Sequence, residues 1–70
     1  MKHYYIYNIP RNKFWKQNRH GYTLDFQSAG YWPQNQLSEL NLDKDDELVL
    51  TTDMDKKYLA VLKKEVARLS

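Results

Sequence analysis

The side chains that could make or break bonds are few and widely separated. His3 and His20 are the only histidines, and the chain has no cysteine. Two isolated imidazoles without a thiolate are too few ligands for a zinc site. Residues 43–47 are acidic enough to attract calcium, but Leu48 and Met54 stand where a calcium-binding EF-hand loop needs glycine and a carboxylate. We therefore expect no metal site and no cofactor.

Nucleophilic catalysis has little support either. Without cysteine the nucleophile would be a serine or threonine, and none sits in the glycine-flanked elbow of hydrolases. Asp25 and His20 could approach each other, but an acid–base pair needs an enclosed pocket, which small domains rarely form. Gly21 and Gly30 stand alone, so no glycine-rich phosphate loop is present. The sequence predicts a protein that is not an enzyme.

Residues suited to recognition are abundant instead. Ten of the 70 residues are aromatic, and nine of these lie in the first 32 residues. A domain of this size buries only roughly 60% of its unfolded surface, so part of the ring surface should remain exposed. Tyrosine, tryptophan and arginine also dominate the energetics of protein interfaces. The predicted protein-binding residues are Tyr5, Tyr7, Arg11, Trp15, Arg19 and Trp32.

A nucleic-acid interface is the alternative use of the same region. Residues 11–22 interleave cations with aromatic rings, a combination that binds single-stranded nucleic acids. The C-terminal segment adds cations opposite an apolar stripe, and these would either follow phosphates or simply solubilise a helix. The candidate nucleic-acid contacts are Lys13, Lys16, Lys56, Lys63, Lys64 and Arg68.

The distribution of charge favours a protein partner over nucleic acid. The formal net charge is +2, made up of +4 in residues 1–32, −6 in residues 33–55 and +4 in residues 56–70. This segregation indicates an oriented surface rather than a uniformly basic one. A homo-oligomer, formed through Ala60 and Ala67 or through a strand edge, is a variant of the same expectation.

These residues need a scaffold, and the sequence predicts one small α+β domain over residues 1–70. Aromatic and β-branched residues at 3–9 and 13–17 predict two antiparallel strands joined by a turn at Pro10. Because Phe14 and Trp15 alternate across the second strand, one of the two must face the core. A second turn ends at Gly21, the expected positive-φ residue. Residues 25–32 are expected to be irregular.

The second half of the chain predicts two helices and one more strand, in the overall order β-β-α-β-α. Pro33 begins a short helix over residues 33–41, and residues 47–51 form the third strand of a mostly antiparallel sheet. A longer helix spans residues 53–69, with Thr52 as its N-cap. The helical spacing places Glu65 on the side of this helix where the other residues are apolar. The expected core is Ile6, Leu37, Leu40, Leu48, Leu50, Tyr58, Leu62 and Val66.

Nothing in the sequence predicts a membrane or an oxidising compartment. There is no run of about 18 apolar residues, and residues 1–5 lack the apolar core of a signal peptide. The lack of cysteine fits a reducing cytosol. We therefore expect a cytoplasmic protein with no membrane partner.

One segment resembles small proteins of bacteriophage and prophage genomes. Trp15-Lys16-Gln17-Asn18-Arg19-His20-Gly21-Tyr22-Thr23, followed by Ala29-Gly30-Tyr31, matches their W-x-x-N-x-x-G-Y-T and A-G-aromatic pattern. The resemblance extends over residues 4–50, except that Pro33-Gln34-Asn35-Gln36 replaces an acidic helix start. It brings no assigned activity. It implies a bacterial host cell as the setting and a host protein as the partner. This chain would occlude or retarget that protein, as an anti-defence inhibitor does.

Overall fold

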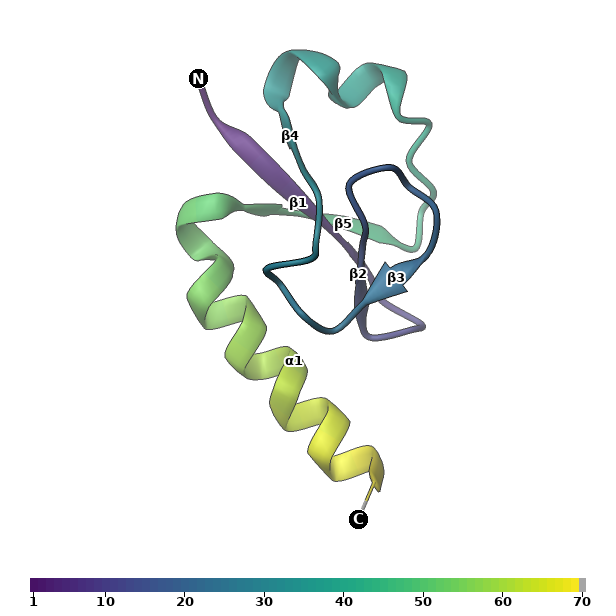
Figure 1. The fold of residues 1–70 in the computed structure, drawn as a ribbon, viewed down its shortest axis with the longest axis vertical. Coiled ribbons are helices and arrows are strands. Elements are labelled where there is room, and N and C mark those ends of the chain that lie inside the picture. The colour runs from purple at the N-terminus through teal and green to yellow at the C-terminus, as the bar shows by residue number, and fades with distance from the viewer. Residues whose placement is uncertain (70) are drawn as a thin grey trace.

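The computed structural model describes residues 1–69, and strand β1 (His3–Asn8) lies at the centre of its antiparallel sheet (Figure 1). Strand β5 (Asp46–Leu50) pairs along one edge of β1. The other edge is shared, because β4 (Tyr31–Pro33) pairs with the first half of β1 and β2 (Lys13–Trp15) with its end. The α+β class predicted from the sequence is confirmed. Ser70, the last residue of the predicted domain, lies outside the described residues.

The sheet has five strands where three were expected. Strand β3 (Tyr22–Thr23) pairs with β2, and β4 falls partly within the segment expected to be irregular. Strands of two or three residues are too short to show an alternating pattern. Gly21, at φ 107°, turns the chain into β3 as predicted. Gly30 serves a different need: a Cβ there would lie 2.3 Å from the Gln17 Cα, so only glycine fits.

The two predicted helices exist with different starts. The short helix is a 3-10 helix, η1 (Gln34–Glu39), and Pro33 precedes it as the last residue of β4. The long helix α1 (Met54–Leu69) follows a 3-10 turn, η2 (Thr51–Asp53). The prediction that Thr52 caps α1 is therefore wrong. Because η2 follows β5 directly, Thr52 lies inside that turn, which has no side-chain cap.

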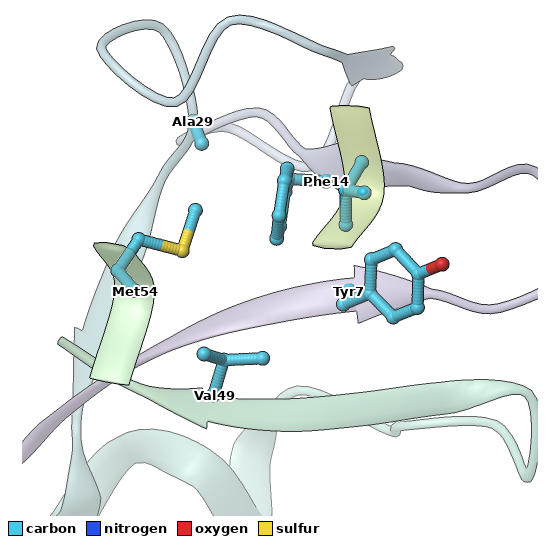
Figure 2. Close-up of a cluster of buried hydrophobic side chains, with 6 residues drawn as sticks. Tyr7, Phe14, Ala29, Val49 and Met54 are labelled. Carbon is cyan, nitrogen blue, oxygen red and sulfur yellow. The ribbon is translucent and has the colours of Figure 1, made fainter. Parts of the chain in front are cut away.

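The main core lies between α1 and one face of the sheet (Figure 2). Tyr7 and Phe14 are cross-strand partners, and their ring centroids lie 5.4 Å apart. Val49 extends this layer from β5, and Met54 and Val61 cover it from α1. Ile6 and Trp32 are buried on the opposite face, since Ile6 alternates with Tyr7 along β1 and Trp32 pairs with Tyr4.

Three residues predicted to lie in the core are exposed. Leu48, Leu62 and Val66 retain 41%, 37% and 67% of their accessible surface. Leu62 and Val66 are exposed because α1 crosses the sheet obliquely and its C-terminal half extends past the strands (Figure 1). The first half of α1 therefore supplies its buried residues, Met54 and Val61. Leu48 pairs with Ile6 and therefore lies on the face that α1 does not cover. Of the other predicted core residues, Ile6 is fully buried and Leu37, Leu40, Leu50 and Tyr58 are half-buried.

A buried asparagine in the β1–β2 turn ties α1 to the sheet. Asn12, at φ 54°, accepts a hydrogen bond from the Tyr7 hydroxyl. Its Nδ2 donates to the Val61 carbonyl at 3.0 Å and to Glu65 at 3.4 Å. Glu65 also pairs with Arg68, 3.7 Å away. These bonds explain why an acidic residue stands on the sheet-facing side of α1, where the sequence pattern expects an apolar one.

Candidate protein-binding surface

Four side chains pack against one another in a row on the sheet face opposite α1. Trp15 and Tyr22 are cross-strand partners on β2 and β3, with ring centroids 4.2 Å apart and ring planes tilted by 42°. The Arg19 guanidinium lies 4.3 Å from the centre of the Trp15 ring, and that of Arg11 lies 4.4 Å from the Tyr22 ring. The order is Arg11, Tyr22, Trp15, Arg19, which we call the cation–aromatic ladder. Each ring thus has one aromatic and one cationic neighbour.

A carboxylate holds the middle of the ladder in place. Asp46 Oδ1 accepts hydrogen bonds from Trp15 Nε1 and from Asn8 Nδ2, both at 3.0 Å. The Asp43 backbone amide donates to Oδ2 at 3.2 Å. Burial alone would raise the pKa of Asp46, but these hydrogen bonds and the charge of Arg19 outweigh it. The pKa of Asp46 is therefore lower than its ordinary value of 3.8, and the carboxyl is ionised at neutral pH.

Arg19 is held at one end of the ladder by its own contacts. Its Nη1 donates to the Leu40 carbonyl at 2.5 Å, and its guanidinium covers Trp15. Its backbone has φ 61°, in the left-handed region that disfavours a side chain with a Cβ. An arginine in such a conformation costs about 1–2 kcal/mol, so the contacts of its side chain must offset that cost.

A cationic hollow adjoins the other end of the ladder. It has a volume of about 470 Å³ and is lined by Pro10, Arg11, Lys13, Tyr22 and Arg68. Arg68 forms an ion pair with Glu65. Within residues 1–69, Arg11 and Lys13 have no acidic partner. The hollow therefore has a positive potential that attracts carboxylates or phosphates.

Three of the six predicted protein-binding residues come together in the ladder: Arg11, Trp15 and Arg19. The prediction that Tyr7 and Trp32 lie at the surface is wrong, because these side chains are only 1% and 7% exposed. Tyr7 lies on the face that α1 covers. Tyr5 is half-buried on that face, beside Tyr31 at 5.7 Å between ring centroids.

The ladder also contains a residue absent from the predicted binding set. Tyr22 was counted among the aromatics of the nucleic-acid alternative, but not as a contact residue. A hairpin that closes at Gly21 places residue 22 opposite residue 15, and the observed register is Trp15 with Tyr22. The pairing follows from the turn, so Tyr22 was within reach of sequence reasoning.

The six cations of the nucleic-acid alternative are spread over the molecule. Lys13 and Arg68 line the cationic hollow. Lys64 lines a separate apolar hollow beside Ile9 and Pro10, and Lys56 lines a groove along β5. Lys16 and Lys63 are exposed but line none of these three.

Comparison with protein-family models, curated proteins and solved structures found no match for this chain. Within residues 1–69, no three histidine or acidic side chains are grouped so as to hold a metal ion. No helix in the same range is long and apolar enough to cross a membrane. The geometry of the ladder and the hollow is therefore the main guide to function.

Proposed function

We propose that this chain is a non-enzymatic binding protein that recognises an acidic patch on a protein partner. The cation–aromatic ladder and the adjoining cationic hollow are its contact surface. The single observation that carries this proposal is the packed row Arg11, Tyr22, Trp15 and Arg19, in which the residue types typical of interface hot spots are already in contact.

Two of the four ladder side chains are held by hydrogen bonds within the chain. Ordering a long side chain at an interface costs about 0.5–1.5 kcal/mol. Trp15 is bound to Asp46, and Arg19 is bound to the Leu40 carbonyl. A partner that docks on the ladder therefore loses less free energy to ordering than it would on free side chains.

The chemistry of the partner follows from the cations at the ladder and the hollow that form no ion pair within residues 1–69. Arg11 is exposed, and within residues 1–69 neither it nor Lys13 forms an ion pair. A guanidinium presents a planar fork of donors that matches a carboxylate. An aspartate or glutamate side chain entering the hollow would meet both cations at once. This supports an acidic protein surface as the ligand.

A protein fits this surface better than single-stranded nucleic acid. Bases bind such proteins by stacking on free aromatic faces. Here Trp15 has Tyr22 and Arg19 within 4.3 Å of its ring centre, and Tyr22 has Trp15 and Arg11 within 4.4 Å. Little ring surface is left for a base. The guanidinium edges and the hollow remain accessible, and these suit carboxylates.

The cellular setting of the proposal rests on the phage-like pattern in residues 15–31. In that setting the partner is a protein of a bacterial host, which the chain occludes or retargets in the cytoplasm. An inhibitor of a host defence protein is the form that we propose.

Affinity capture from bacterial lysate tests the proposal when it compares charge reversals at two exposed sites. Arg11→Glu reverses a ladder cation, and Lys44→Glu makes the same change in the loop before β5. We expect the wild type and Lys44→Glu to retain one acidic protein, and Arg11→Glu to lose it. Equal recovery by all three proteins would contradict the proposal. So would recovery that disappears after nuclease treatment, since the ligand would then be nucleic acid.

A further inference from the structure

Strand β5 has one edge that no other strand within residues 1–69 covers. Among the strands in the described part of the chain, β5 pairs with β1 alone, through five consecutive register pairs. Natural proteins usually block such edges with charged side chains, lysine above all, or with proline or a bulge. In β5 the charged residues are confined to its start, Asp46 and Glu47; Leu48-Val49-Leu50 follows without lysine or proline, and the unbroken register has no bulge. The edge is open to pairing with a further strand.

The register identifies which backbone groups face outward. The Ile9 amide donates to the Asp45 carbonyl, so Ile9 and Asp45 are a hydrogen-bonded pair. Hydrogen-bonded and non-hydrogen-bonded residue pairs alternate along two antiparallel strands. Glu47 and Val49 therefore direct their amides and carbonyls toward β1, whereas Leu48 and Leu50 direct theirs away from it. The Leu48 amide and carbonyl lie at the middle of the open edge.

A groove of about 490 Å³ follows this edge between β5 and α1. Glu47–Leu50 line it along the strand, and Lys56, Lys57 and Ala60 line it along the helix. Leu48 is 41% exposed beside it. The short side chain of Ala60 leaves room in the helix wall for a side chain of an incoming segment.

The charges that line the groove balance one another. Lys57 Nζ lies 2.6 Å from the Glu47 carboxylate and 4.2 Å from the centre of the Tyr7 ring. Asp53 and Lys56, which line the same groove, are of opposite sign. The groove thus carries no net charge, in contrast to the cationic hollow beside the ladder. It suits an uncharged segment rather than an acidic one.

We propose that the β5–α1 groove binds an extended, uncharged segment of a protein partner, with apolar side chains at alternate positions, as a further strand of the sheet. Main-chain hydrogen bonds to the amide and carbonyl of Leu48 and to the amide of Leu50 would supply affinity, since the Leu50 carbonyl already caps η2. Pockets for alternate side chains would supply selectivity. This site is independent of the ladder.

A second copy of this chain fits the groove less well. An antiparallel β5–β5 pair would bring Asp46 and Glu47 of each copy into a groove without net charge. It would also bring the two α1 helices together on the same face of the joined sheet, each with Lys56 at its groove. Like charges in such proximity disfavour the pairing. The occupant that we infer is therefore a segment of another protein.

The test is a titration of the full chain with a capped peptide of alternating valine and threonine, at concentrations up to about 2 mM. Binding is measured from the NMR chemical shifts of the protein's backbone amides. We expect saturable shifts at Glu47–Leu50 and at Lys56–Ala60, with little change in the Trp15 indole signal. The same peptide N-methylated at alternate residues retains its side chains but cannot form the main-chain hydrogen bonds to β5, and should not bind. Equal binding of both peptides, or no binding of either, would overturn the proposal.

A variant of the protein tests the same edge from the other side. Leu48→Pro removes an outward-facing amide, and proline is tolerated at such edge positions because the bonds to β1 remain. We expect peptide affinity to fall about fivefold or more, and to fall less in Leu48→Thr, which changes the side chain in the groove but retains the amide. Leu48→Pro should still capture the acidic partner through the ladder, so the two proposals can fail separately. A dimer of the wild type that Leu48→Pro dissociates would overturn the proposal in favour of a second copy.

Discussion

Phe14 and Trp15 are neighbours on the same short strand, and they show how differently the two faces of the sheet use aromatic rings. Phe14 is fully buried beneath α1, against Tyr7. Trp15 is half-buried on the opposite face, and its indole is held by Tyr22, Arg19 and Asp46. The first ring is stabilised by removal from water. The second is stabilised by stacking and by a hydrogen bond to a carboxylate.

The comparison shows that an excess of aromatic residues does not identify a binding surface by itself. Alternation along β1 and β2 sends Tyr7 and Phe14 to the face that the helix covers. The polar partners of a ring distinguish the two cases. Tyr7 bonds to the buried Asn12, whereas Trp15 and Tyr22 lie against guanidinium groups that reach solvent. Rings of the second kind are the ones that hold cationic groups where a partner can contact them.

The largest effect is expected from truncating the buried ring. Phe14→Ala should lower the free energy of unfolding by about 3–5 kcal/mol, because it removes apolar contacts and leaves a cavity. A domain of this size has little stability beyond that amount, so the variant should be largely unfolded at 25 °C. Urea denaturation followed by circular dichroism measures the change. Phe14→Leu, which refills most of the volume, should lose much less, and equal losses would argue against a packed core.

The next effect concerns the polar link between the sheet and α1. Asn12→Ala and Asn12→Gly both remove the acceptor of the Tyr7 hydroxyl and the extra bond to the Val61 carbonyl, at a cost of about 1–3 kcal/mol. Glycine tolerates φ 54° and alanine does not, so Asn12→Ala should be the less stable by about 1 kcal/mol. Thermal unfolding of the two variants separates the hydrogen bonds from the backbone. Equal stability would show that the left-handed conformation of residue 12 is not retained.

How much of this could be predicted from the sequence depends on how local each feature is. The β1–β2 hairpin, β5 and α1 have patterns long enough to be recognised, and their bounds agree within a few residues. The short strands β3 and β4 were missed, because they depend on pairing and on Gly30 fitting against Gln17. The direction in which α1 crosses the sheet has no local signal. That direction decides that Leu62 and Val66 are exposed.

The candidate site was predictable to a similar degree. Arg11, Trp15 and Arg19 were predicted because turn residues and a strand aromatic are neighbours in any hairpin. Their anchor, Asp46, was not predicted, because its bond to Trp15 spans 31 residues of sequence. The acidic segment that contains Asp46 was weighed as a set of calcium ligands, and the third strand was expected to begin at residue 47. Long-range hydrogen bonds of this kind leave no periodic trace in a sequence.

A smaller effect is expected at the carboxylate that anchors the ladder. The pKa of Asp46 is lower in the folded chain than its ordinary value of 3.8. The stabilisation it gives is therefore present above that value and is lost as the pH falls through the lower folded pKa. Asp46→Asn should lose about 1–2 kcal/mol at pH 7. It should also lose less stability than the wild type between about pH 5 and pH 2.

Urea denaturation at several pH values measures this difference. Asp45→Asn is the matched control, since its carboxylate neighbours Asp46 in sequence but has no side-chain bond to the ladder. The control should retain the acid sensitivity of the wild type. If both variants follow the wild-type profile, the Trp15–Asp46 bond contributes nothing to acid sensitivity.

The smallest change in stability, and the clearest separation of stability from binding, is expected at Arg19. Arg19→Gly removes the guanidinium from Trp15 and from the Leu40 carbonyl, a loss of about 1–2 kcal/mol. It also relieves the cost of φ 61°, a gain of about 1 kcal/mol. The two effects nearly cancel, so the midpoint in urea should move little. Capture of the acidic partner should nevertheless fall, because one end of the ladder is gone.

Arg19→Lys is the matched variant, since it retains the positive charge and the left-handed backbone but not the planar stack. If charge alone attracts the partner, lysine should restore capture to the wild-type level. If the stacked guanidinium is what the partner meets, lysine should bind more weakly than arginine although its net charge is unchanged. An Arg19→Gly protein that captures the partner as well as the wild type would confine the contact surface to Arg11 and the cationic hollow.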